Sequence, residues 1–284
     1  MLPNDPEANR HRERTRTPML QYQIPLLYLA GGCYLAAVLG YLGNLRLASR
    51  RLAGIALALV ACGWLAQSGS LLLRWQAAGF LPVTNLFSTQ FFFSWSLALT
   101  YLYFDLRYRI GAAGLFVMFV NLLLIASILP RDPAIPALIP SLDTPLFTLH
   151  IIFSFTGYAM FTMAFSIGVL YLWQQARPTR QLPDLALLRK LNEEAVFLGF
   201  CLFSACMLFG AIWAYIAWGY YFSWNIKGVW SFIVWLFYAG MCHAKFVRRW
   251  QGRGYAILSI LGFAVVLFTY LGIGLLLESN HPLD

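Results

Sequence analysis

Long apolar segments alternate with short polar ones along the whole chain. Eight segments contain no Asp, Glu, Lys or Arg, and most have about the 20 apolar residues that a helix needs to cross a bilayer. They are Ile24–Gly43, Leu52–Leu73, Val83–Phe104, Ile110–Leu129, Leu146–Trp173, Val196–Trp218, Val229–Ala244 and Tyr255–Leu277. A helix satisfies its own backbone hydrogen bonds in lipid. The pattern therefore predicts an all-α fold, a polytopic membrane helix bundle with about eight transmembrane helices.

The composition strengthens this prediction and sets the domain organisation. Of the 284 residues, 60% are apolar and only 11% are charged, against about 25% charged in an average soluble domain. We expect a polar N-terminal tail at residues 1–23 and a single transmembrane domain at 24–284, with a tryptophan-rich loop near 213–230. The polar stretch Arg177–Glu194 predicts a short helix, because Pro183-Asp184 resembles a helix start. Membrane lipid is the expected surrounding, and no nucleic-acid partner is expected.

The basic residues predict an orientation. With both termini outside, most loop arginines and lysines fall on the inner side, as the positive-inside rule requires. These inner residues are Arg46, Arg50, Arg51, Arg107, Arg109, Arg177, Arg180, Arg189, Lys190, Lys245, Arg248, Arg249 and Arg253. The outer loops hold only Arg74, Arg131 and Lys227. Four arginines of the N-terminal tail oppose this orientation, but the loops agree along the whole chain, so both termini are expected outside.

Three histidines are candidate ligands. His150 and His243 are the only Asp, Glu, Lys, Arg or His residues inside the apolar segments, and His281 follows the last segment by four residues. An ionisable side chain in a membrane is a functional hypothesis by default, because its burial is costly. The alternative for each is a neutral imidazole bonded to a neighbouring helix. In the expected orientation, His150 and His281 lie at the outer face and His243 lies near the inner face.

Aromatic residues are concentrated between residues 213 and 238, which hold half of the ten tryptophans. An interfacial aromatic belt accounts for a few rings at each helix end. It does not account for a segment such as Trp218–Trp230, where nearly half the residues are aromatic. A flat apolar ligand suits such a platform, and haem fits because two neutral imidazoles can hold its iron. Zinc fits less well, because no third or fourth ligand is near in sequence.

Four segments, in order along the chain, resemble one protein family. PVTNLF (82–87) resembles the family's PxxNLYES, and residues 138–161 resemble a span that carries an outer histidine. Residues 211–245 resemble the family's WGxxWxWDPKExW loop and the span after it, which ends in LHAR. Residues 253–281 resemble the closing span and its terminal histidine. Between residues 82 and 281 the chain thus resembles the CcsA/ResC family of cytochrome c assembly proteins, a haem-handling group with a "WWD" loop.

The resemblance implies a function for the chain. The chain would be the CcsA-type subunit of a haem lyase, which delivers haem to apocytochrome c and attaches it covalently. It would lie in the cytoplasmic (inner) membrane with its active site facing outside. The resemblance implies haem b as cofactor. Its implied partners are a CcsB/ResB-like membrane protein, an apocytochrome c with a CxxCH motif, and proteins of a thiol-reducing pathway. No catalytic residue of the chain is assigned.

The resemblance also implies roles for individual residues. His150 and His281 would ligate the haem iron, and His243 would ligate it transiently near the inner side. The aromatic platform would consist of Trp218, Tyr221, Phe222, Trp224 and Trp230. Lys227 or Arg131 could pair with a haem propionate, although a solvated interfacial charge is an equal alternative for each.

The chain departs from the family pattern near this platform. Phe222 replaces a Trp, Asn225 an Asp, Ile226 a Pro, Gly228 a Glu, Ser88 a Glu and Gly274 an Asn. These changes keep two alternatives open. One is a haem carrier, an exporter or a HemX-like regulator without ligation activity. The other is a structural membrane subunit whose aromatic residues act as anchors.

Overall fold

The computed structural model describes residues 21–179 and 181–272. Its α-helices are α2 (Gln23–Leu47), α3 (Arg50–Ala78), α4 (Leu86–Tyr108), α5 (Gly111–Ile128), α6 (Pro145–Ala176), α7 (Leu185–Trp218), α8 (Ile226–Ala244) and α9 (Arg253–Leu267). Short 3-10 helices η1 (Pro140–Leu142) and η2 (Arg248–Trp250) and a π-helix η3 (Phe268–Gly272) complete it. The predicted all-α fold is confirmed, since the described residues contain no strand and each predicted span overlaps one α-helix, the last continuing from α9 into η3. Most of the predicted N-terminal tail lies outside the described residues.

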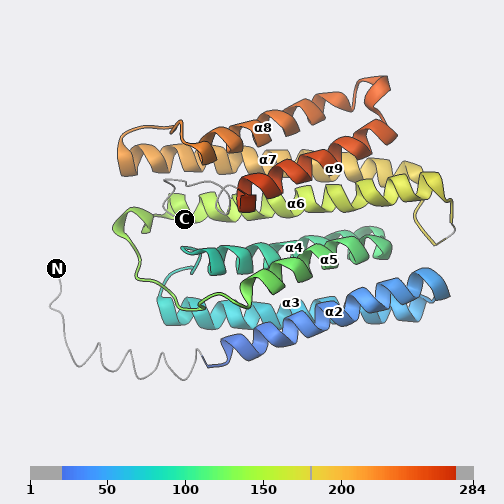
Figure 1. Cartoon of the computed structure of the whole chain (residues 1–284), viewed down its shortest axis with the longest axis horizontal. Coiled ribbons are helices and arrows are strands. Elements are labelled where there is room, and N and C mark those ends of the chain that lie inside the picture. The colour runs from blue at the N-terminus through green and yellow to red at the C-terminus, as the bar shows by residue number, and fades with distance from the viewer. Residues whose placement is uncertain (1–20, 180, 273–284) are drawn as a thin grey trace.

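Successive helices run in opposite directions along the long axis of the molecule (Figure 1). The turns 79–85, 129–144 and 219–225 therefore lie together at one end, which we call the aromatic end. The connections 48–49, 109–110, 177–184 and 245–252 lie at the opposite end, which we call the basic end (Figure 1). Except for Arg180, which lies outside the described residues, the basic loop residues predicted to share one side lie at or near the basic end. The alternation of helices thus separates charge between the two ends of the bundle.

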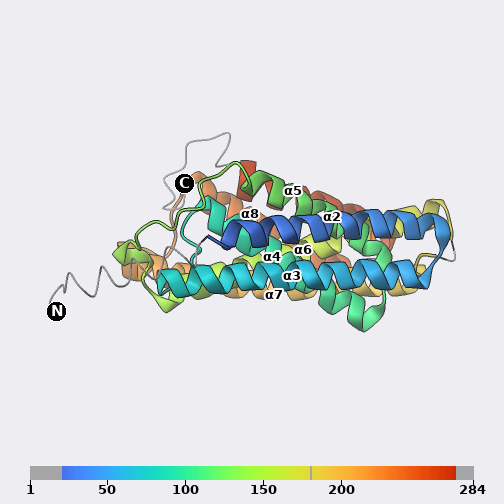
Figure 2. The same cartoon turned by 90° about the horizontal axis from the view of Figure 1, so that it is seen from below.

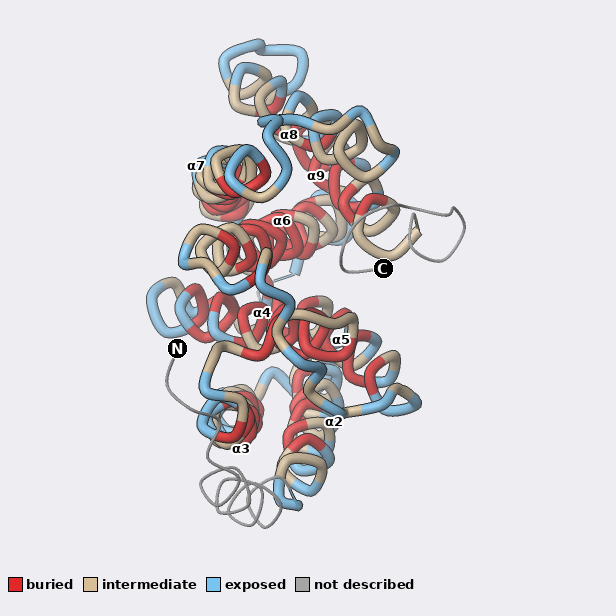
Figure 3. Tube along the Cα trace, turned by 90° about the vertical axis from the view of Figure 1, so that its left-hand side faces the viewer, coloured by how far each residue is buried: buried red, intermediate tan, exposed pale blue. Residues whose placement is uncertain are grey.

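Helices α4 and α6 occupy the middle of the bundle (Figure 3). α6 packs against α4 and α5 on one side and against α7 and α9 on the other. α2 and α3 form an outer hairpin, which Figure 2 shows side by side. The hairpin turns at Ala48, whose φ is +50°, and Ser49 caps α3 by accepting a hydrogen bond from the backbone of Leu52. α6 can thus present its aromatic-end residues to the helices on both sides.

Six of the described helical segments are long and apolar enough to cross a membrane. α4 and α8 are not among them, although eight spans were predicted. α4 carries Ser, Thr and Gln side chains, and most of its residues are buried against other helices. Gln90 and Ser94, for example, are 1% and 0% exposed. The polar residues of α4 therefore face protein, and its lower hydropathy follows from its central position.

The polar stretch before α7 differs from its prediction. A short helix was expected within Arg177–Glu194, but the helix that starts there runs unbroken from Leu185 to Trp218. The predicted start is correct, because the side chain of Asp184 accepts a hydrogen bond from the backbone N–H of Leu187 at 2.8 Å. The charged first turns stay helical because Arg189 and Glu193 form an ion pair one turn apart, at 2.9 Å.

Candidate functional site: an aromatic cavity beside His150

A cavity of about 720 Å³ opens at the aromatic end of the bundle. Its wall is built by α6, α7, the turn 219–225, the start of α8 and the π-helix η3, together with Leu86, Thr89 and Arg131. Ligand pockets in proteins commonly measure about 300–1,000 Å³ and are mostly apolar with a few polar groups. This cavity has that character, because rings and aliphatic side chains supply most of its wall.

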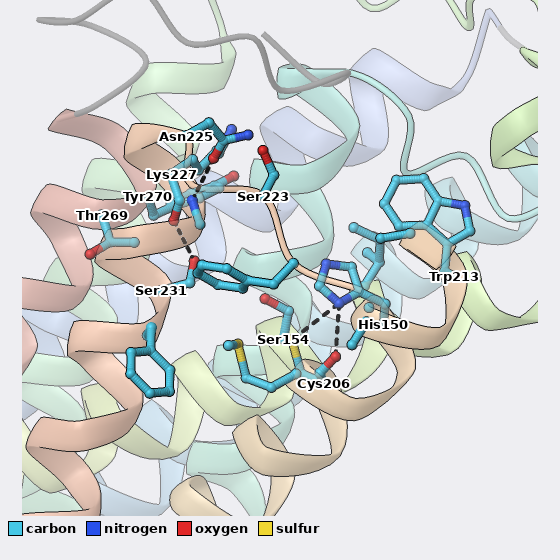
Figure 4. A pocket seen from close by; sticks show the side chains of 18 of the residues that line it. His150, Ser154, Cys206, Trp213, Ser223, Asn225, Lys227, Ser231, Thr269 and Tyr270 are labelled. Carbon is cyan, nitrogen blue, oxygen red and sulfur yellow. Dashed lines mark hydrogen bonds between the residues drawn. The ribbon is translucent and has the colours of Figure 1, made fainter. Parts of the chain in front are cut away.

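His150 projects into this cavity from the second turn of α6, five residues after the helix start at Pro145. Its Nδ1 lies 2.9 Å from the backbone carbonyl oxygen of Cys206 on α7 and 3.4 Å from the Cys206 sulfur (Figure 4). A carbonyl oxygen can only accept a hydrogen bond, so Nδ1 carries the proton. When the imidazole is neutral, its lone pair is therefore on Nε2, the nitrogen that can bind a metal.

Two residues of α7 form the seat for this ring. A Cβ at Gly210 would lie 2.5 Å from Nδ1 of His150, so the absent side chain makes room for the imidazole. Trp213 stacks beside it, with ring centroids 6.2 Å apart and planes 22° apart. Trp213 is itself fixed, because its Nε1 donates a 2.7 Å hydrogen bond to the backbone oxygen of Ser141. The orientation of His150 is therefore set by packing and by hydrogen bonding together.

The predicted aromatic platform lies largely at the cavity. Trp218, Tyr221, Phe222 and Trp224 line it, and Trp224 is 85% exposed at its rim. Trp230 does not belong to the lining. Asn225 caps α8, so Trp230 is helical, and its ring packs 4.6 Å from the ring of Phe268 at the start of η3. Trp230 thus supports the wall from behind, beside the π-helix whose next residues, Thr269 to Leu271, line the cavity.

The start of α8 adds polar groups on the side of the cavity opposite His150 (Figure 4). The side chain of Asn225 accepts a hydrogen bond from the backbone N–H of Gly228 at 2.7 Å and so caps the helix. Gly228 itself is required by space, because a Cβ there would collide with the backbone oxygen of Ser223. Lys227 and the positive end of the helix dipole therefore lie at the cavity wall.

The charge of the described lining has one sign. Arg131 and Lys227 are its cations, and none of its described residues is Asp or Glu. The wall also holds the hydroxyl groups of Ser154, Tyr158 and Tyr270, of which Tyr270 donates to Thr89 on α4 at 3.1 Å. The cavity is therefore suited to a ligand that is flat, largely apolar and negatively charged at an edge.

The other two predicted histidines lie elsewhere. His243 is exposed at the last turn of α8, at the basic end, and its Nδ1 lies 2.9 Å from the backbone oxygen of Ala239 in its own helix. It is thus at the opposite end of the bundle from His150, as the sequence predicted. His281 lies outside the described residues.

Part of the cavity lining was not predicted from the sequence. Ser154 and Tyr158 follow His150 at helical spacing on α6, and Cys206 and Gly210 are one turn apart on α7. The i, i+4, i+8 spacing from His150 was the available signal for the α6 residues. No local pattern indicates that Cys206 and Gly210 face His150, because the contact joins residues 56 positions apart.

Fold and site together define a polytopic membrane protein with an aromatic cavity whose described lining contains one imidazole and two cations. The comparison with protein families gives the particular group. A family model described as "Cytochrome C assembly protein" matches residues 83–281, which include α4 to α9. The chain belongs to this family, and its role lies in cytochrome c biogenesis. Because haem is the group that cytochrome c assembly handles, family membership implies haem handling.

Individual relatives agree with this assignment. The chain is 30% identical over 238 residues to the cytochrome c biogenesis protein CcsA of Prochlorococcus marinus (strain MIT 9312), a match that covers 72% of this chain and 77% of the relative. It is 28% identical over 235 residues to CcsA of Guillardia theta, covering 73% and 78%. Among solved structures, the cytochrome c haem lyase CcmF shares the fold, with a TM-score of 0.71, 15% identity and 92% of this chain covered. The chain spans 47% of that lyase chain.

Proposed function

We propose that this chain holds haem b in the cavity at the aromatic end and presents it to apocytochrome c, as the CcsA-type subunit of a haem lyase. In this proposal the aromatic end faces the outer side of the cytoplasmic membrane, and haem is a substrate that passes to the acceptor. The basic end then faces inward, in agreement with the positive-inside rule.

One observation carries the proposal. His150 stands in the wall of a haem-compatible cavity with Nδ1 bonded to the Cys206 carbonyl oxygen and with its Nε2 lone pair available. Metal-binding imidazoles are commonly oriented by such a hydrogen bond from the second ring nitrogen, which fixes the tautomer and raises the basicity of the ligating nitrogen. Packing against Gly210 and Trp213 already restricts the His150 ring, so the side chain loses less conformational entropy when it binds the iron.

The roles of the chain's own residues follow from their positions. His150 binds the iron on one side, and we assign the second axial position to His281. Trp218, Tyr221, Phe222 and Trp224 cover the macrocycle and exclude water, while Trp230 supports the wall through Phe268. Haem itself supplies the vinyl groups that accept the two thiols of a CxxCH motif. The protein thus contributes orientation and protection of the bound haem.

His243 has a separate role in the proposal. It is an exposed imidazole at the basic end of α8, where haem would enter from the inner side. We propose that it binds haem iron transiently together with a CcsB/ResB-like membrane partner. The remaining partners are an apocytochrome c with reduced CxxCH thiols and the pathway that keeps those thiols reduced.

The carrier alternative draws on the Asn225 replacement. The family's Asp at this position and Asn are nearly equal as helix N-caps. In this chain Asn225 caps α8 through Gly228 and holds Lys227 at the cavity wall. The replacement therefore keeps the local backbone that shapes the site. This favours ligation activity over a carrier or regulator that has lost it.

Complementation tests the proposal. The chain and its native partner are expressed in a strain that lacks its own cytochrome c synthase, and covalent haem in a reporter cytochrome is measured by haem staining. We expect wild-type chain to restore the reporter and His150→Ala to abolish restoration. A chain that accumulates haem in the membrane but never yields holocytochrome would be a carrier instead.

A further inference from the structure

Arg131 is a cation of the cavity wall whose guanidinium group is hydrogen-bonded at Nε. It lies in the turn after α5 and lines the cavity wall. Its Nε donates to the side-chain oxygen of Gln90 on α4 and to the backbone oxygen of Ser127, both at 3.1 Å. No described residue accepts a hydrogen bond from either terminal nitrogen of its guanidinium group. The group is therefore held at its base, and its outer fork remains available to a ligand.

The scaffold behind Arg131 is rigid. Gln90 is 1% exposed on the central helix α4. Two residues further along the turn, the backbone oxygen of Pro133 accepts a 2.7 Å hydrogen bond from the guanidinium group of Arg74 on α3. Arg74 is 1% exposed and also donates to Ser88 at 2.9 Å. The turn that carries Arg131 is thus fastened to both α3 and α4.

We infer that Arg131 is a carboxylate clamp that selects the acidic edge of the ligand, and this inference rests on the proposed function. A guanidinium fork matches a carboxylate in geometry and can form two parallel charge-assisted hydrogen bonds. Haem carries two propionate carboxylates on one edge, and the described lining holds no Asp or Glu that would compete for Arg131. Arg131 therefore determines specificity for the diacid form of the porphyrin and fixes its rotation in the cavity.

Gln90 acts as a positioning residue in this inference. Its side-chain oxygen accepts from Nε, which turns the two terminal nitrogens of Arg131 outward. Replacing Gln90 by Leu keeps the cation but removes one of its two anchors. The preference for a carboxylate should then weaken without loss of charge.

Binding of haem and of haem dimethyl ester to the full-length protein in detergent tests the inference. The two ligands differ only in their carboxylates, so the ratio of their Kd values isolates the acidic edge. We expect wild-type protein to favour haem by roughly tenfold to a hundredfold, the range for a charge-assisted hydrogen-bonded pair. Arg131→Gln should bring the ratio close to one with ester affinity unchanged. Arg131→Lys and Gln90→Leu should give intermediate ratios.

Arg248→Gln is the matched control, because it removes one exposed positive charge at the basic end and should keep the wild-type ratio. Equal affinity of wild-type protein for both ligands would overturn the inference and leave the proposed function standing. An equal loss of both ligands in Arg131→Gln would also overturn it, because that result assigns Arg131 a structural role. Wild-type protein that binds neither ligand would contradict the proposed function itself and the inference with it.

Discussion

Gly210 and His150 fit together so closely that a Cβ on Gly210 would lie 2.5 Å from Nδ1 and 2.8 Å from Cε1 of the imidazole. Contacts of that length do not occur between a real Cβ and a ring, so one of the two groups would have to move. The ring cannot retreat while keeping its 2.9 Å hydrogen bond to the Cys206 carbonyl oxygen. A methyl group added at Gly210 would therefore displace the His150 imidazole from its present orientation.

We predict that Gly210→Ala lowers haem retention by at least tenfold, because the displaced imidazole loses both its tautomer control and its aim into the cavity. Haem per protein in the purified variant is the measurement. Gly240→Ala on α8 is the matched control, since a Cβ there meets no atom within 4 Å, and it should keep wild-type haem. Wild-type haem content in Gly210→Ala would show that the close fit is irrelevant to binding.

Cys206 contacts His150 through both its backbone carbonyl oxygen and its thiol, and a substitution can tell which contact orients the imidazole. Its carbonyl oxygen holds Nδ1 at 2.9 Å, whereas its sulfur lies at 3.4 Å. We predict that Cys206→Ala keeps the low-spin haem spectrum, because the carbonyl group remains. Loss of that spectrum on substitution, with the protein still folded, would assign the orienting contact to sulfur. The measurement is electronic absorption of the purified variant.

Asn225 should act as a helix cap first. We predict that Asn225→Ala destabilises the protein by about 1 kcal/mol, because the N–H of Gly228 loses its acceptor. Asn225→Asp should keep stability and complementation, because an aspartate caps equally well and suits the helix dipole. Thermal unfolding in detergent, followed by tryptophan fluorescence, measures the first effect. Equal stability of the Ala and Asp variants would contradict the capping role.

Arg74 should be a determinant of stability. Arg74 is buried, and its guanidinium carbon lies 4.7 Å from the centroid of the Phe87 ring. No described carboxylate pairs with Arg74, because the family's Glu is replaced by Ser88, which accepts a hydrogen bond from it. We predict that Arg74→Ala costs about 3 kcal/mol, because it leaves a cavity and deprives the oxygens of Pro133 and Ser88 of a donor. Arg248→Ala is the exposed control. An unfolding midpoint unchanged by Arg74→Ala would refute this role.

The apolar periodicity predicted the helices well, because lipid forces each long apolar segment to satisfy its own backbone. The segment Leu146–Trp173, for example, lies wholly within α6 and places His150 near the start of that helix. The stretch before α7 was harder, since its high density of charge suggested a short helix separate from the apolar span, whereas one helix runs through both. Charged residues such as Arg189 and Glu193 end an apolar segment, but at helical spacing they also pair with each other and allow the helix to continue into water.

The candidate site was only partly predictable. His150 stood out because ionisable side chains are rare in membrane segments, and the aromatic residues stood out because an interfacial belt does not explain their density in Trp218–Trp230. The seat of His150 depends on the meeting of α6 with α7, which no local pattern encodes. Trp230 was expected at the platform but packs on Phe268, a contact between α8 and the start of η3 that no local pattern encodes.

In the proposed function Nε2 of His150 binds haem iron, and low-temperature EPR spectra of purified wild-type and His150→Gly protein report on this bond. We expect a low-spin signal in wild-type protein, a high-spin signal in the variant, and return of the low-spin signal when imidazole is added to fill the space of the missing ring. A low-spin signal in His150→Gly that equals the wild-type signal before imidazole is added would contradict the claim.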